Sequence, residues 1–113
     1  MIDTKVGATD GGLDLLTASQ LAARISINHT ELLERETMVL QLACAWADVH
    51  DIDSTSLDYQ PLIERACQFG GDGTPEVSEY CAAEFGVLQG LTSMTGRLII
   101  GDALDLRHRL PEL

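Results

Sequence analysis

The sequence predicts an all-α protein. Hydrophobic residues make up 45% of the 113 residues and aromatic residues only 4%, and leucine and alanine are the commonest apolar types. This composition favours helices that pack through aliphatic side chains over sheets with cross-strand aromatic pairs. Residues 13–50 contain no glycine or proline, so we expect one long amphipathic helix there and shorter helices after it. A chain of this length supports at most one compact domain.

The first residues differ in character from the rest. Residues 1–12 are polar, contain three glycines and lack any periodicity, which predicts a flexible N-terminal arm. Residues 13–113 are interpreted as a single helical domain.

The long helical stretch is either one helix or two helices joined near Asn28. A break is plausible there because Asn28 and Glu31 have the spacing of a capping pair. In its second half an apolar stripe recurs at helical spacing and is broad enough to need a partner: Leu33, Thr37, Leu40, Cys44 and Ala47. We therefore name Leu33, Leu40 and Trp46 as candidate interface residues, with Trp46 serving as a core or interface anchor.

Two shorter helices are expected next. Pro61 suits a first helical turn, and a short amphipathic helix should follow until Gly70 and Gly71 end it; its apolar residues are Leu62, Ile63, Ala66 and Phe69. Thr74 before Pro75, with an acid in the first turn, then predicts the N-terminus of the next helix.

The last two helices have the spacing of a helix-turn-helix. Gly86 suits the small position that lets the second helix approach, Gly90 suits the turn, and Leu91 and Ile99 suit the apolar positions, with Ala103, Leu106 and Leu110 continuing the stripe. Gln89 and Gly96 depart from the motif. The alternative is a plain helical hairpin packed on the long helix.

If the motif binds DNA, the start of its second helix makes the contact. The side chains predicted to point outward there are Thr92, Ser93, Met94, Thr95 and Arg97. Arg107, His108 and Arg109 form a small basic group at the other end, and a favourable interaction with the helix C-terminus is the preferred interpretation of these cations over a DNA-binding patch.

The charge balance restricts any nucleic-acid contact to this last part. The formal net charge is -11 and the only lysine is Lys5. Nucleic-acid binding proteins usually present a basic face. Residues 86–113 alone balance their acids and arginines, so contact with DNA is predicted there or nowhere.

Catalytic, metal and membrane functions find no support in the sequence. The three histidines are scattered, and no nucleophile or zinc pattern is present. The spacing of Asp51, Asp53 and Thr55 is similar to the start of a calcium loop, but Ser56 and Leu62 occupy its essential glycine and glutamate positions. The glycines around Asp72 lack the lysine of a phosphate-binding loop. We expect no cofactor, no metal and no catalysis by this chain.

The cysteines and the N-terminus indicate location. The three cysteines are widely spaced without a C-x-x-C pair, and neither a signal peptide nor a membrane span is recognisable. The expected location is the cytoplasm.

Three segments together resemble one actinobacterial family. Residues 46–50 (WADVH), 71–75 (GDGTP) and 102–111 (DALDLRHRLP) are similar to motifs of the thirteen-E-twelve repeat family, whose members carry domain of unknown function two-two-two ahead of an HNH nuclease domain. The resemblance covers roughly residues 32–111. It implies that this chain is the N-terminal part of such a protein, an incomplete, truncated copy of the family domain without the nuclease motif.

Two functions remain open from the sequence. The first is a non-catalytic helical module of an HNH-endonuclease-like protein that assists DNA binding. The second is a protein-interaction or dimerisation module without nucleic-acid contact, in which the long helix mediates self-association.

Overall fold

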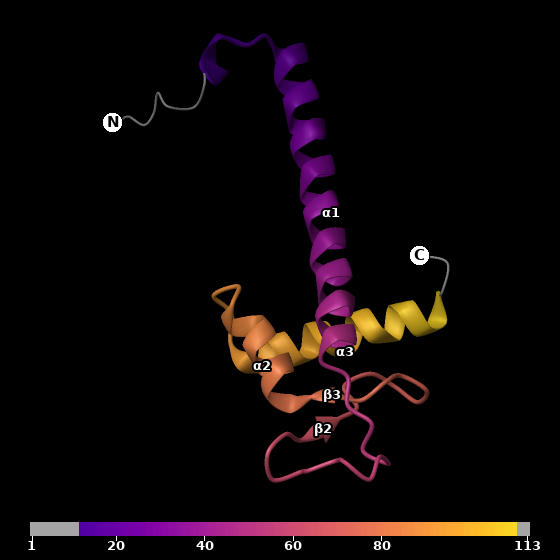
Figure 1. Cartoon of the computed structure of the whole chain (residues 1–113). Coiled ribbons are helices and arrows are strands. Elements are labelled where there is room, and N and C mark those ends of the chain that lie inside the picture. Colours follow the sequence, from indigo (N-terminus) through magenta and orange to yellow (C-terminus); the bar gives the residue numbers. More distant parts are fainter. Residues whose placement is uncertain (1–11, 111–113) are drawn as a thin grey trace. The chain divides into compact units, whose positions relative to one another are not determined.

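The computed structural model describes residues 12–110, and the predicted N-terminal arm lies almost entirely outside them. The elements follow in the order η2 (Leu13–Leu15, a 3₁₀ helix), α1 (Ala18–Val49), β2 (Ala66–Cys67), β3 (Val77–Ser78), α2 (Glu79–Val87) and α3 (Ser93–Arg109) (Figure 1). The predicted helical class is confirmed, with a long helix followed by shorter helices of which the last two pack together. The chain divides into two units, Met1–Glu36 and Thr37–Leu113, and α1 contributes to both.

Helix α1 begins with a reciprocal cap. The Thr17 N–H donates to Gln20 Oε1 (2.9 Å), and the Gln20 N–H donates to Thr17 Oγ1 (3.1 Å). This is a capping box, which satisfies two backbone donors at the helix start. The helix then continues through Asn28 without a break, so the single-helix alternative is the correct one.

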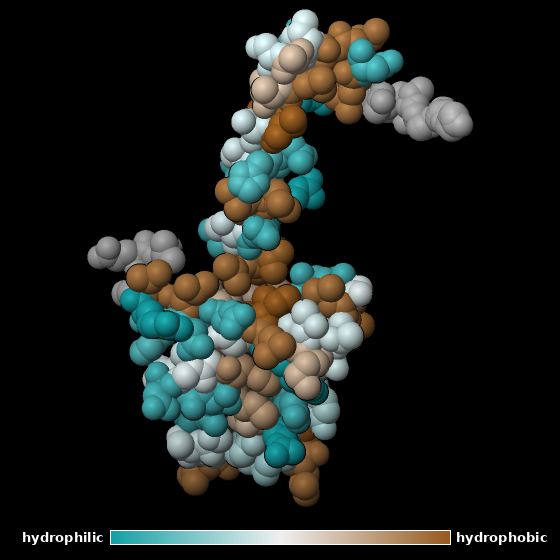
Figure 2. All heavy atoms as spheres, turned by 180° about the vertical axis from the view of Figure 1, so that it is seen from behind, coloured by the Kyte–Doolittle hydropathy of each residue, from teal (hydrophilic) through white to brown (hydrophobic). Residues whose placement is uncertain are grey.

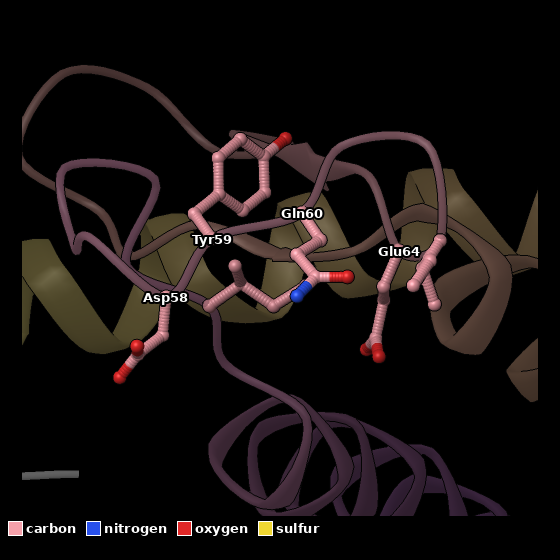
Figure 3. Close-up of a pocket in the computed structure, with 6 residues that line it drawn as sticks. Asp58, Tyr59, Gln60 and Glu64 are labelled. Atoms are coloured by element: carbon pink, nitrogen blue, oxygen red, sulfur yellow. The ribbon is translucent and has the colours of Figure 1, made fainter.

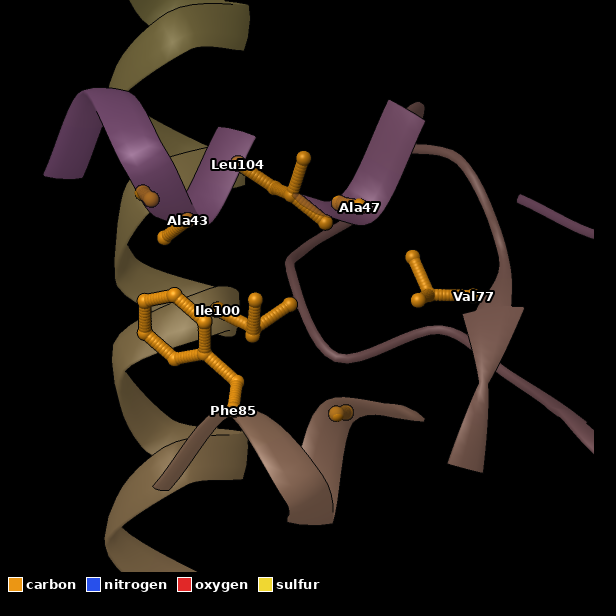
Figure 4. Close-up of a cluster of buried hydrophobic side chains, with 8 residues drawn as sticks. Ala43, Ala47, Val77, Phe85, Ile100 and Leu104 are labelled. Atoms are coloured by element: carbon orange, nitrogen blue, oxygen red, sulfur yellow. The ribbon is translucent and has the colours of Figure 1, made fainter. Parts of the chain in front are cut away.

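The core of the second unit is assembled from α1, β3, α2 and α3. Figure 4 shows Ala43 and Ala47 of α1 facing Ile100 and Leu104 of α3, with Phe85 of α2 beside them. Small alanines on α1 let the backbones approach, and the larger side chains fill the remaining space. The complete set of buried apolar residues is Ala43, Ala47, Val77, Ala82, Phe85, Ile100, Ala103 and Leu104.

The helix predicted after Pro61 is absent. Residues 61–64 form turns, and Ala66 and Cys67 pair antiparallel with Ser78 and Val77. The Glu79 N–H also donates to the Arg65 carbonyl (2.8 Å). Tertiary strand pairing overrides the local helical pattern here, because the short segment does not bury its apolar face: Leu62 and Ile63 are both exposed.

Helix α2 begins later than predicted. Thr74 is not its N-cap; the Thr74 hydroxyl donates to the Gly71 carbonyl (2.7 Å) inside the preceding loop. Residues 76–78 stay extended because they bond to the segment that follows α1: the Ser78 N–H donates to the His50 carbonyl and the Ile52 N–H to the Glu76 carbonyl, each at 3.0 Å. Ser78 then caps the helix by accepting from the Cys81 N–H.

Helices α2 and α3 cross at two glycines. A Cβ added to Gly86 would lie 2.3 Å from the Thr92 carbonyl oxygen, and one added to Gly96 would lie 2.4 Å from the Gly86 nitrogen. Gly96, which departs from the helix-turn-helix pattern, is therefore required by this close approach. Gly90 makes the turn with φ 74°, as the sequence predicts for a glycine turn.

The buried stripe of α3 is rotated from the predicted one. Ala103 is buried as predicted, and Ile100 and Leu104 are the fully buried large residues, whereas Ile99 is half-buried and Leu106 and Leu110 are exposed. The error is a shift of one position around the helix. Its cause is the contact at Gly96, which turns the residues four and eight positions later toward the core.

Candidate interaction surfaces

The first half of α1 has no buried side chain. Every residue from Thr17 to Met38 is exposed, although the segment carries many large apolar residues. Figure 2 shows hydrophobic side chains alternating with hydrophilic ones along this helix. Such an apolar surface on an exposed helix is typical of an interaction site.

A coiled-coil spacing runs along this half, with apolar residues at three of its five positions. Separations of four and three residues alternate through Leu21, Ile25, Asn28, Leu32 and Arg35, which we call the α1 seam. Ile25 is 69% exposed and Leu32 is 51% exposed. Continued along the helix, the same spacing reaches Val39, which packs against the core of the second unit. The seam was missed from the sequence because the neighbouring stripe through Leu33 was followed instead.

The three candidate interface residues lie in different surroundings. Leu33 is exposed in the first unit, whereas Leu40 and Trp46 pack against the chain's own core. The Trp46 indole N–H donates to the Cys81 carbonyl (2.7 Å), which ties α1 to α2. Leu40 and Trp46 thus serve intramolecular packing.

The candidate DNA-binding residues gather at the start of α3. Thr92 is its N-cap: its Oγ1 accepts from the Thr95 N–H (3.1 Å) and donates to Thr95 Oγ1 (2.9 Å). Ser93 and Arg97 are half-buried, and the buried Arg97 Nε has no hydrogen-bond partner among the described groups. The two threonine hydroxyls therefore already bond to one another and to the cap.

The outward face of α3 is apolar and acidic. Met94 and Leu98, four residues apart, are both about 60% exposed, and Asp102 lies exposed one turn further on. Leu91, in the turn before the helix, is exposed as well. A surface that reads DNA normally presents basic and amide side chains at these places.

The arginines of α3 do not share one face. Successive helical residues are rotated by about 100°, so Arg97, Arg107 and Arg109 project in directions between about 80° and 160° apart. Arg107 Nη1 also forms an ion pair with Asp48 Oδ2 of α1 (2.8 Å), and that hydrogen bond raises the pKa of Arg107. Arg107 is thus engaged within the protein.

The glycine loop before β3 is held against α3. The Gly71 N–H donates to Asp105 Oδ1 (2.6 Å), and Gln68 Nε2 donates to the Thr74 carbonyl (2.9 Å). A carboxylate occupies the place where an anion would bind in a phosphate loop. This loop therefore serves to dock the strand pair onto the helix.

A shallow pocket lies in the loop between α1 and β2. Figure 3 shows Asp58, Tyr59, Gln60 and Glu64 around it, and Ile52 and Ile63 complete the lining. The Tyr59 hydroxyl accepts from the Ala66 N–H (3.1 Å) and is thereby used structurally. Among residues 12–110, no group of histidine, cysteine or acidic side chains is arranged to hold a metal ion.

The calcium-like spacing forms a local turn. Asp53 Oδ1 accepts from the Thr55 N–H (2.9 Å) and from the Thr55 hydroxyl, and these bonds lower the pKa of Asp53. Ser54 Oγ donates to Glu76 Oε1 (2.6 Å). Asp53 and Glu76 therefore accept hydrogen bonds that hold this loop together.

The thiol of Cys44 lies partly buried beside α3. Burial raises the pKa of Cys44, although the nearby Arg107 opposes that shift. Its Sγ lies 3.5 Å from the Ala103 carbonyl oxygen, to which it donates. A raised pKa keeps the group as a thiol, unlike a reactive cysteine.

Comparison with known proteins gives no relative. No protein-family model matches the chain, and neither a curated protein nor a solved structure matches it. Among the helices of residues 12–110, none combines the length and the apolar character that a bilayer crossing requires.

Proposed function

We propose that this protein is a non-catalytic interaction module that binds another helix through the α1 seam. The observation that carries the proposal is the exposure of the whole first half of α1, in which Leu21, Ile25 and Leu32 fall on a coiled-coil spacing. This interaction module is the second of the two functions that the sequence leaves open.

The energetics of an uncovered helix support the proposal. Helices in proteins owe most of their stability to the packing of one apolar face rather than to intrinsic propensity. Full burial of one leucine or isoleucine side chain contributes about 1.5–3 kcal/mol. Leu21, Ile25 and Leu32 are 37%, 69% and 51% exposed, so covering them would supply a corresponding part of that free energy at each position.

Two adjacent alanines allow a matched test. Ala22 flanks the α1 seam, whereas Ala23 lies on the opposite side of the helix, and both are exposed. Each is replaced in turn by the photo-crosslinker p-benzoylphenylalanine, and the variants are irradiated in cells that carry the gene. We expect a discrete protein adduct from position 22 and none from position 23. Equal adducts from both positions, or none from either, would contradict an interaction through the seam.

A second candidate function is the DNA-binding module of an HNH-endonuclease-like protein. It is favoured by the hairpin of α2 and α3, whose close glycine crossing and left-handed Gly90 turn suit a helix-turn-helix. The resemblance to the thirteen-E-twelve repeat family supports the same context. In this function Thr92, Ser93, Thr95 and Arg97 contact the duplex.

The DNA proposal is tested by fluorescence anisotropy of labelled random duplex DNA at several salt concentrations. DNA binding requires an affinity that falls with salt and falls further in Arg97→Ala, because phosphate contacts release counterions. Arg109→Ala is the matched control at the other end of α3. No binding at low salt rules out this function and leaves the interaction module.

A further inference from the structure

We propose that the helix covering the α1 seam is α1 of a second copy of this chain, bound antiparallel. This inference rests on the proposed function, since it names the partner of the same seam. Two properties of the first half of α1 carry it: the polar residues within the seam and the charges beside it.

The apolar seam residues suit a two-helix pairing. In the heptad pattern Ile25 and Leu32 occupy one core position, while Leu21, Asn28 and Arg35 occupy the other. Helices paired from Ala18 to Arg35 would overlap along about 27 Å. Beyond Arg35 the seam continues into Val39, which contacts the chain's own core, so the uncovered part ends there.

Arg35 discriminates between the two directions of pairing. In a parallel pair without offset, each seam residue meets its own copy, and two Arg35 side chains would be brought together in the seam. In an antiparallel pair, Arg35 meets Ala18 of the second copy at the end of the overlap. There its long side chain reaches water beside a small residue. Leu21 then faces Leu32 of the second copy.

The flanking charges favour the same antiparallel register. Arg24 and Glu31 occupy the same flanking position of successive heptads, and both are exposed. In the antiparallel register Arg24 lies beside Glu31 of the second copy, and the symmetry repeats the pair. A parallel pair instead places Glu31 beside Glu36 of the second copy, which is a repulsive contact.

Shifting the antiparallel register by one heptad removes this match. A shift in one direction pairs Glu31 with Glu31 of the second copy, and a shift in the other pairs Arg24 with Arg24. Only the register with Ile25 opposite Asn28 has opposite charges on both sides of its centre. Asn28 accordingly lies near the centre, where a polar core residue fixes register at some loss of stability.

The first experiment is sedimentation equilibrium of the full chain across the micromolar range. We expect a monomer–dimer equilibrium that Ile25→Asp weakens by about a hundredfold or more, because a carboxylate enters the seam. Ile27→Asp is the matched control, since Ile27 is exposed on the outer side of the same helix. It should leave the equilibrium nearly unchanged.

Charge reversal at Glu31 reports the direction of pairing by the sign of its effect. Glu31→Arg places two cations together in the antiparallel dimer and should weaken it about tenfold, and the added Arg24→Glu should restore it. In a parallel dimer Glu31→Arg would meet Glu36 and tighten association. Glu34→Arg, an equal charge change on the outer side, is the control, and circular dichroism checks that each variant keeps its helix content.

Cross-links from position 22 locate the second helix directly. An adduct near His29 of a second copy supports the antiparallel register, whereas an adduct near Thr17 supports a parallel pair and overturns it. A chain that stays monomeric, but forms an adduct with a different protein from position 22, overturns the second copy as partner and leaves the proposed function standing. If position 22 gives no adduct beyond that of position 23, both the second copy as partner and the proposed function are overturned.

Discussion

The two halves of α1 are one continuous helix with opposite surroundings. Residues 18–36 have no buried side chain, whereas Ala43 and Ala47 in the second half are almost completely buried. Both halves carry apolar residues at three- and four-residue spacing. The comparison teaches that an amphipathic pattern predicts a helix and a need for burial, but does not tell which molecule provides the burial.

Composition of the buried faces explains part of the difference. The buried positions of the second half are alanines, which allow α3 to approach closely, and Trp46 adds a hydrogen bond to α2. The seam of the first half has larger leucine and isoleucine residues together with Asn28 and Arg35. Polar residues at such positions are tolerated in a helix pair that keeps them near water or pairs them.

The largest expected effect is at the crossing that supports the second half. In Gly86→Val the new Cβ would lie only 2.3 Å from the Thr92 carbonyl oxygen, and the two methyl groups would need further space. We expect a loss of more than about 3 kcal/mol, because backbone rather than a flexible side chain would have to move. The loss in free energy of unfolding is measured by urea denaturation, with the fluorescence of Trp46 as the signal. Gly90→Ala, where no atom lies near, should lose only about 1 kcal/mol from its positive φ.

Replacing leucine by alanine in the core and in the first half of α1 compares the burial of the two regions directly. Leu104→Ala in α3, facing the second half of α1, should lower the free energy of unfolding by about 2–5 kcal/mol, since Leu104 is only 1% exposed. Leu32→Ala should change it by less than about 0.5 kcal/mol at concentrations where the chain is monomeric. A comparable loss for both variants would show that the first half is covered within one chain.

Trp46→Phe tests the polar link between the second half and α2. The ring volume is partly kept, but the Cys81 carbonyl loses the indole N–H that lies 2.7 Å away. We expect a loss of about 1–3 kcal/mol from the unpaired carbonyl and the smaller ring. Because the fluorophore is removed, far-ultraviolet circular dichroism should follow this unfolding transition.

A smaller effect is expected from the ion pair at the end of the second half. Arg107→Gln removes the 2.8 Å bond to Asp48, in a pair whose two side chains are more than a third exposed. Solvent screening limits the loss to about 0.2–1 kcal/mol. Thermal melts at low and high salt check this, since the difference between wild type and variant should shrink as salt increases.

The smallest effect concerns pH. Hydrogen bonds from Thr55 lower the pKa of Asp53, so its folded-state pKa lies below that of the unfolded chain. The associated stability is present above the unfolded pKa and is lost as the pH falls through the folded pKa. Thr55→Ala should raise the pKa of Asp53 toward its ordinary value in a carboxyl titration followed by NMR. An unchanged pKa in the variant would show that these bonds do not form in solution.

The sequence was most predictive where short-range chemistry decides. The absence of glycine and proline through residues 13–50 identified the long helix, and Gly90 identified the turn between the last helices. It failed at residues 61–78, where an apparently amphipathic segment and a good cap at Thr74 became a strand pair. Those local preferences are weaker than the hydrogen bonds that residues 50–52 make to residues 76–78.

The candidate surfaces divide in the same way. Leu33 was correctly placed on a long apolar helix, but nothing in the local pattern separates it from Leu40, which lies two turns further along and packs inside. Likewise, Thr92 and Thr95 match the start of a recognition helix, and only the folded geometry shows their hydroxyls bonded to each other. Side-chain exposure and bonding depend on neighbours distant in sequence.

The sequence by itself determined the helical class, the long helical stretch through residues 13–50 and the α2–α3 turn, because each follows from backbone propensity and period within a few residues. Only the tertiary structure decided which part of α1 is covered, which face of α3 is buried and why Gly96 is a glycine. Those outcomes depend on contacts between segments 59 positions apart, such as Cys44 with Ala103 and Asp48 with Arg107.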